Sequence, residues 1–177
     1  KLKMRGPAAE VIAAYTGDSY SQHAAKDADL RERWGTEEAR INTIELRDAT
    51  GQIATRIDTN SAMQIRTNIT AQTTLRAPVI KVYISKLDGL VVWSSTSHRA
   101  DGKVGNMQES VTATIDIPQL PLLEGTYFLS VACTDATGTT EYDHCQNWVR
   151  FDVHQEDVFE EGLVAVPSAW RIDRQPK

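Results

Sequence analysis

The segment Gln64-Ile65-Arg66-Thr67-Asn68-Ile69-Thr70-Ala71 decides the fold class, because side chains suited to a core alternate along it with polar ones. Ile65, Thr67 and Ile69 fall on one side, and the polar residues between them fall on the other. Successive side chains of a β-strand point to opposite faces of the sheet. The segment therefore predicts a strand with one buried face and one open face.

The same alternation recurs at residues 41–46, 79–85, 111–117, 126–134 and 148–153, and residues 90–95 read as a strand that returns from a turn. Turn residues separate these runs, and Asp88-Gly89 is a strong hairpin signal. Short strands at this rhythm predict an all-β fold, either a sandwich or a barrel. Polar residues on the second face of several strands favour antiparallel sheets with one open face.

The two ends of the chain read differently from the middle. Residues 7–15 predict a short helix that ends at Gly17, and the polar residues after it read as a linker. We therefore expect a helical segment at 1–16, a linker at 17–36 and the sandwich at 37–177. Near the C-terminus, the apolar run at 162–167 predicts a further strand. Such a strand can pair with its own sheet or with a neighbouring chain.

Composition narrows the function classes. The chain has 177 residues and a net charge of −5, which disfavours a nucleic-acid partner. No apolar run approaches the roughly 18 residues of a membrane span, and no signal peptide is evident. Two cysteines without a Cys-x-x-Cys pair predict neither a disulfide framework nor a zinc site. These features predict a soluble, cytoplasmic domain without a cofactor.

Several sequence pieces resemble one known family. Arg33-Trp34-Gly35-Thr36, followed by residues 38–41, resembles the opening of the C-terminal domain of Wzt-type ABC-transporter ATPases, which export O-antigen and related polysaccharides. Further pieces match in the family's order, over residues 33–170: 48–51, 88–92, 120–123, 125–127, 129–132, 142–143, 151–153, 162–164, Pro167 and Trp170. Residues 6–15 also resemble the last helix of an exporter's nucleotide-binding domain. Because the chain has no phosphate-binding loop, we expect a C-terminal portion of a larger ATPase.

The resemblance implies a function and a set of partners. It implies an immunoglobulin-like antiparallel sandwich that binds a lipid-linked polysaccharide and couples its recognition to export. It also implies a homodimer in which the last strand, 162–167 here, is exchanged between protomers. The transmembrane subunits of the exporter would be reached through the ATPase domain, at the inner face of the bacterial plasma membrane.

A sugar site needs aromatic faces to stack on the ring and polar groups to hold the hydroxyls. The strands offer aromatic and cationic side chains for this, and a polar loop at 96–103 adds two more candidates. Cationic groups would also suit an acidic or phosphorylated sugar. The alternative interpretation is that each aromatic packs under a loop or a partner, and that the loop is merely solvated. The predicted carbohydrate-binding residues are Arg66, Lys81, Tyr83, Trp93, His98, Arg99, Trp148 and Arg150.

Other chemistry receives less support from the sequence. Asp143-His144-Cys145 has too few evident partners for a zinc site, and neighbours in sequence seldom face each other as a catalytic pair. We therefore predict no catalytic residue and no metal ligand. Trp34 and Trp170 are interpreted as packing anchors, and Cys133 as a small core residue. Two alternatives stay open: a purely structural dimerisation module of the ATPase, and an enzyme that modifies the glycan.

Overall fold

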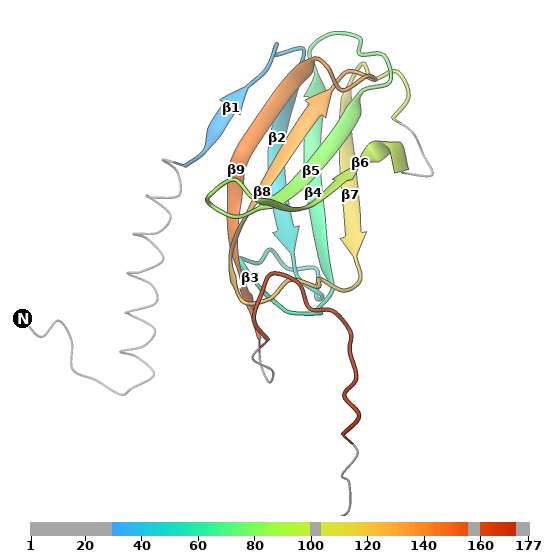
Figure 1. The fold of residues 1–177 in the computed structure, drawn as a ribbon. Helices are drawn as coiled ribbons and strands as arrows, with labels where there is room; N and C mark the ends of the chain where they lie inside the picture. Colours follow the sequence, from blue (N-terminus) through green and yellow to red (C-terminus); the bar gives the residue numbers. More distant parts are fainter. Residues whose placement is uncertain (1–29, 100–103, 156–159, 173–177) are drawn as a thin grey trace, which may run out of the picture.

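The computed structural model describes residues 30–99, 104–155 and 160–172, which form two sheets packed face to face (Figure 1). Sheet A has the strand order β1-β9-β8-β5-β6, with β3 added in parallel to β9, and sheet B has the order β2-β4-β7. The elements are β1 (Glu32–Trp34), β2 (Ala39–Arg47), β3 (Arg56–Asp58), β4 (Met63–Ala71), β5 (Val79–Ser85), β6 (Val91–Thr96), the 3-10 helix η1 (Ser97–Arg99), β7 (Ser110–Ile117), β8 (Gly125–Thr134) and β9 (Glu141–His154). The predicted fold class, an all-β antiparallel sandwich of the immunoglobulin-like kind, is confirmed.

The core lies between the two sheets. The central strand of sheet B, β4, buries Ile65 and Ile69 almost completely, and β8 of sheet A buries Leu129 and Val131 against them. Each such side chain contributes about 1.5–3 kcal/mol through burial. Thr67 lies on the same inward face of β4, and its hydroxyl donates to the carbonyl oxygen of residue 43 at 2.9 Å. The deciding segment therefore folds as its alternation predicts, with its one inward polar group satisfied.

Three strand segments differ from the sequence-based expectation. β1 lies inside the predicted linker and pairs with β9, so the sandwich begins before residue 37. β3 is only three residues long, which is too short for alternation to be recognised in the sequence. β9 begins at Glu141 rather than at Trp148, and its first half contains the inward, buried Asp143. A carboxylate at a core-facing position breaks the apolar alternation on which the prediction relied.

The C-terminal run pairs with its own chain. Val164 bridges Leu122, and the amide of Ala165 donates to the carbonyl of Pro121 at 2.8 Å. This is one of the two predicted pairings, and strand exchange remains a prediction. Trp170 is 91% exposed, so among the described residues it does not act as the predicted packing anchor.

The remaining expectations concern the ends of the chain. The predicted helix at 7–15 lies outside the described residues, as does most of the linker. The described part of the chain contains no helix with the length and hydropathy of a membrane span.

Candidate functional site

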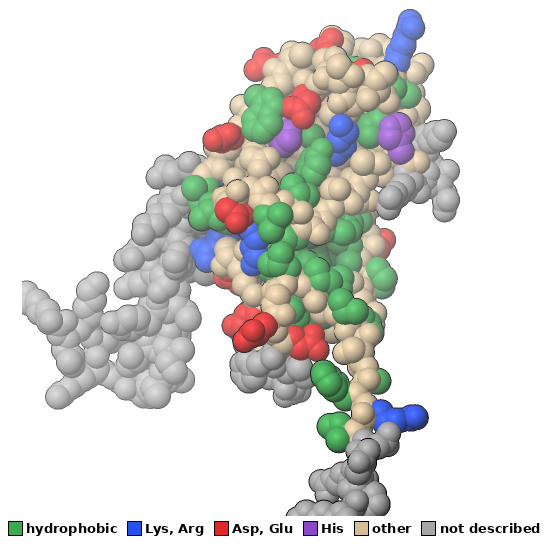
Figure 2. Space-filling model, viewed as in Figure 1, with side chains coloured by type: hydrophobic (Ala, Val, Ile, Leu, Met, Phe, Trp, Pro, Cys, Tyr) green, Lys and Arg blue, Asp and Glu red, His purple; other side chains and the backbone are tan. Residues whose placement is uncertain are grey.

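The outer face of sheet A brings together side chains from four strands. In register, Lys81 of β5 lies opposite Ala132 of β8, Ala132 lies opposite His144 of β9, and His144 lies opposite Trp34 of β1. Tyr83 lies two residues beyond Lys81 and opposite Ser130. This face is toward the viewer in Figures 1 and 2, and Figure 2 shows hydrophobic, histidine, basic and acidic side chains gathered on its upper part.

Three rings form a row on this face. Trp34 stacks on His144 with ring centroids 4.1 Å apart and an interplanar angle of 26°. Tyr83 lies 6.0 Å from His144 on its other side, nearly parallel at 2°. The residues of β8 between them, Ala132 and Ser130, are small and buried. Because small side chains leave space above the middle strand, rings from the flanking strands can approach one another. We call Trp34, His144 and Tyr83 the ring row.

Hydrogen bonds fix the orientation of two of these rings. The Glu141 carboxylate accepts from the indole N–H of Trp34, and its other oxygen lies 3.1 Å from His144 Nδ1. Burial alone would raise the pKa of the Glu141 carboxyl, but the hydrogen bonds from His144 and Trp34 outweigh burial and lower it. Burial, with the Glu141 charge nearby, raises the pKa of the Tyr83 phenol. The Tyr83 hydroxyl therefore stays protonated at neutral pH.

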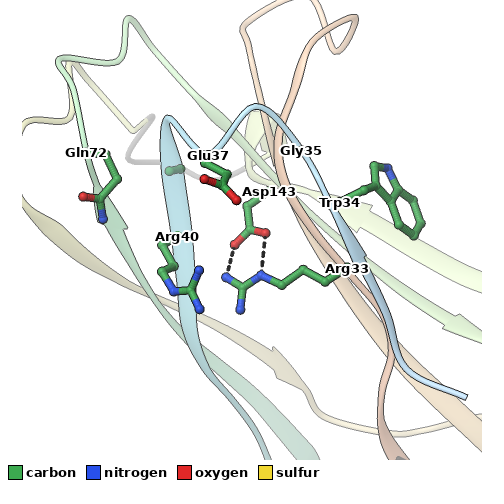
Figure 3. Close-up of a pocket in the computed structure, with 8 residues that line it drawn as sticks. Arg33, Trp34, Gly35, Glu37, Arg40, Gln72 and Asp143 are labelled. Atoms are coloured by element: carbon green, nitrogen blue, oxygen red, sulfur yellow. Dashed lines mark hydrogen bonds and ion pairs between the residues drawn. The ribbon is translucent and has the colours of Figure 1, made fainter. Parts of the chain in front are cut away.

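A salt bridge holds β1, and hence Trp34, in place. Arg33 donates to both oxygens of Asp143, from Nε at 2.9 Å and from Nη2 at 2.5 Å. Asp143 also accepts from the amide of Ile41 on β2 at 2.6 Å, so one carboxylate connects three strands. Figure 3 shows Arg33 pointing toward Asp143 and β2, whereas Trp34 points away from them. We call this arrangement the Arg33–Asp143 clamp.

Gly35 allows the chain to leave β1 and cross to sheet B. Its φ is +145°, and a Cβ atom there would lie 2.4 Å from the carbonyl oxygen of Tyr142. Real Cβ atoms do not approach a backbone oxygen this closely, so another residue would require the backbone to shift. Three consecutive residues therefore have three roles: Arg33 forms the clamp, Trp34 supplies a ring of the ring row, and Gly35 lets the backbone cross to sheet B.

Three of the eight predicted residues lie on the same face as the ring row. Tyr83 belongs to the row and Lys81 lies beside it. Arg150 points outward further along β9, opposite Phe128, with its Nη2 3.6 Å from Asp152 Oδ1. The structure therefore gives this face aromatic and cationic groups together, as the sequence analysis expected of a sugar site.

The other five predicted residues lie elsewhere. Trp93 is opposite the core residue Ile84 and packs against the core, because the register of β6 turns its ring toward sheet B. Arg66 lies on the outer face of sheet B, opposite Glu45. His98 and Arg99 lie in η1, which follows β6.

Trp148 is displaced by a bulge in β9. Asn147 has a φ of +50°, and its amide donates to Ser130 Oγ at 2.9 Å. Beyond this bulge, the Trp148 ring is half-buried, with the guanidinium carbons of Arg31 and Arg33 5.5 and 5.7 Å from its centroid. The eight predicted residues consequently do not form one surface.

Three members of the site were not predicted from the sequence. Trp34 was interpreted as a packing anchor, yet it is 43% exposed. His144 and Glu141 were not proposed for sugar binding, because the strand that presents them was not predicted. The available signal was the short run Asp143-His144, in which an inward acidic residue is followed by an outward ring. Within the described ranges, no group of histidine, cysteine and acidic residues is arranged to hold a metal ion.

The fold and this face define a two-sheet β-sandwich module with an aromatic outer surface. A profile of the Wzt C-terminal domain family matches residues 31–166. The chain belongs to the Wzt C-terminal domain family, a domain of Wzt-type ABC transporters. The likeness stated from the sequence is thereby confirmed.

One solved structure agrees with this assignment at the level of the fold, and two more distant ones are also similar in part. The crystal structure of the C-terminal domain of Wzt has 18% sequence identity and a TM-score of 0.72, and the match covers 80% of this chain and 87% of that one. A Niemann-Pick type C2 protein from the Japanese carpenter ant has 12% identity and a TM-score of 0.48, covering 71% and 98%. A CARDB domain from Pyrococcus furiosus has 16% identity and a TM-score of 0.41, covering 68% and 97%. A search of curated proteins finds no match.

Proposed function

We propose that this domain is the carbohydrate-binding module of a polysaccharide ABC exporter, and that it holds the lipid-linked glycan on the outer face of sheet A. The observation that carries the proposal is the ring row, in which Trp34 is 43% exposed and is oriented by Glu141. An oriented ring offers a flat apolar surface to the C–H face of a pyranose. Lys81 and the Tyr83 hydroxyl lie beside it and suit the hydroxyl or acidic groups of a sugar.

The proposed role is binding without catalysis. Aromatic stacking and a few charge-assisted hydrogen bonds support micromolar to millimolar affinity, or about 4–8 kcal/mol. A homodimer, with residues 162–167 exchanged between protomers, would present two such faces and raise the effective affinity. The bound domain would remain at the cytoplasmic side of the membrane, joined to the transmembrane subunits through the ATPase domain.

The test is a titration of the domain with the producing strain's own polysaccharide, followed by NMR. Trp34→Ala and Tyr83→Ala are each expected to weaken binding about tenfold or more, which corresponds to about 1.4 kcal/mol. Trp170→Ala is the matched control, because it removes an exposed indole from the C-terminal segment, at the opposite end of the sandwich from β1 (Figure 1). If both ring variants bind as tightly as the parent, the site is assigned to the wrong surface.

A second candidate function is a structural dimerisation module with no glycan contact. The exposed apolar residues Val166, Trp170 and Ile172 favour it, because such side chains are commonly covered by a partner. A domain that dimerises in light scattering but binds none of the strain's polysaccharide would support this alternative. Analysis of the glycan after incubation with the domain tests the remaining possibility, an enzyme that modifies it.

A further inference from the structure

The sandwich is closed along one side and open along the other. On the closed side, the Arg33–Asp143 clamp joins β1 and β9 to β2. On the opposite side, β6 and β7 are the last strands of their sheets, and a cavity of about 690 Å³ opens between them. This side is on the right in Figure 1, away from β1. The cavity therefore lies between the sheets and is separate from the outer face that carries the ring row.

The interior of this cavity is aliphatic. Its deep part is formed by Ile80 and Val82 of β5, which are 3% and 1% exposed. Its wall is the inward face of β7, where Val111, Ala113 and Ile115 are only half-buried. On the paired strand β4, the inward residues are almost fully buried. Within residues 30–99, 104–155 and 160–172, the inward face of β7 thus lacks the cover that an inward face normally has, and an apolar ligand would supply it.

The polar side chains that face the cavity among the described residues are uncharged hydroxyls. Ser97 Oγ already accepts from the amide of Ile80 at 3.0 Å. The Ser95 hydroxyl, which lies opposite the inward Val82, has no hydrogen-bond partner among the described residues. No lysine, arginine or histidine is among the described residues that line the cavity, and the Asp116 carboxylate at its rim faces the outside of sheet B, where it accepts from Gln64 at 2.8 Å. An anionic head group would therefore find no counter-charge in the described lining.

From these features we propose that the cavity binds a single aliphatic chain that carries an uncharged, hydroxylated head group. The volume falls within the usual range for small-molecule sites, roughly 300–1,000 Å³. The chain would cover the inward face of β7, and the head group would meet the Ser95 hydroxyl of β6. The proposal does not depend on glycan binding at the ring row, which lies on the other surface of sheet A.

The test uses n-alkyl glucosides of increasing chain length, each below the concentration at which it forms micelles. Isoleucine methyl NMR reports occupancy: the Ile80 and Ile115 signals should shift, and the signal of Ile57, a core residue of β3, should not. Each methylene that enters the cavity should tighten binding about fourfold, from about 0.8 kcal/mol per buried methylene. Glucose alone should leave the methyl signals unchanged, and an alkanoate of equal chain length should bind more weakly than the glucoside.

A cavity-filling substitution separates this site from general detergent binding. Ala113→Phe places a ring in the cavity and should reduce glucoside affinity at least about tenfold, while thermal stability stays at or above that of the parent. Ala136→Phe is the matched control, because Ala136 is exposed in the turn before β9. The proposal is overturned if affinity does not depend on chain length, if the alkanoate binds more tightly, or if Ala113→Phe and Ala136→Phe bind equally well. Trp34→Ala should leave the glucoside-induced shifts of the Ile80 and Ile115 methyl signals unchanged, so failure here is distinguishable from failure of the ring row.

Discussion

Replacing Asp143 with asparagine tests the connection between β1 and the rest of the sandwich. Asp143 is 4% exposed and accepts three hydrogen bonds, two from Arg33 and one from the Ile41 amide. Asparagine keeps the shape and one acceptor oxygen but leaves the guanidinium without its counter-charge. Breaking a fully buried ion pair costs about 3–5 kcal/mol. Because the Arg33 side chain is 25% exposed and water can reach it, we expect a loss of about 2–3 kcal/mol in the free energy of unfolding.

Urea unfolding measures this loss, and a second signal tests its structural cause. If the clamp holds β1, then Asp143→Asn should also change the imidazole NMR signals of His144, because Trp34 leaves its ring. Asp58→Asn is the control: its carboxylate is 46% exposed and lies 3.9 Å from Arg56, so the effect should be below about 1 kcal/mol. An Asp143→Asn domain that unfolds within 1 kcal/mol of the parent, with unchanged His144 signals, would refute the reasoning.

Three further predictions concern single side chains. Gly35→Ala should destabilise the domain by about 3 kcal/mol or prevent folding, because a Cβ atom would overlap the Tyr142 carbonyl; soluble yield and thermal unfolding measure this. The parent should be more stable than Glu141→Gln at pH 7, because the interactions of Glu141 lower the pKa of its carboxyl below the ordinary value of 4.5 despite burial. Urea unfolding at decreasing pH should show this difference in stability disappear as the pH falls below 4.5, because the carboxylate is then protonated in the folded state as well. Burial raises the pKa of the Cys133 thiol to about 12 and that of Cys145 to about 11, so both should resist a thiol reagent at pH 8 until urea unfolds the domain.

Alternation predicted the long strands well because burial of one sheet face selects side chains at every second position. β4, β5 and β8 begin and end within about two residues of the predicted ranges. The first half of β9 was not predicted, because its inward Asp143 is stabilised by Arg33, which lies 110 positions earlier in the chain. A pairing over that distance leaves no local pattern. For the same reason β1, which supplies the arginine, was interpreted as linker.

The site was less predictable than the fold. Tyr83 and Lys81 were recognised because they lie outward on a strand whose other face is clearly apolar. Trp93 was misplaced because the side that an edge-strand residue faces depends on its register with β5, which the hairpin alone does not fix. Trp34 became part of the site only through the pairing of a three-residue strand. Which residues share the candidate site depends on strand register, and register is set by tertiary structure.

β1 is the strand through which the sandwich is connected to the residues that precede it. Residue 31 joins β1 directly to everything that precedes the sandwich, and β1 also carries Trp34. A ligand that contacts Trp34 stabilises the pairing of β1 with β9. By thermodynamic reciprocity, any change that separates β1 from β9 lowers the affinity for that ligand by the same free energy. Displacement of β1 alone would therefore weaken the binding of such a ligand, without any rearrangement of the two sheets.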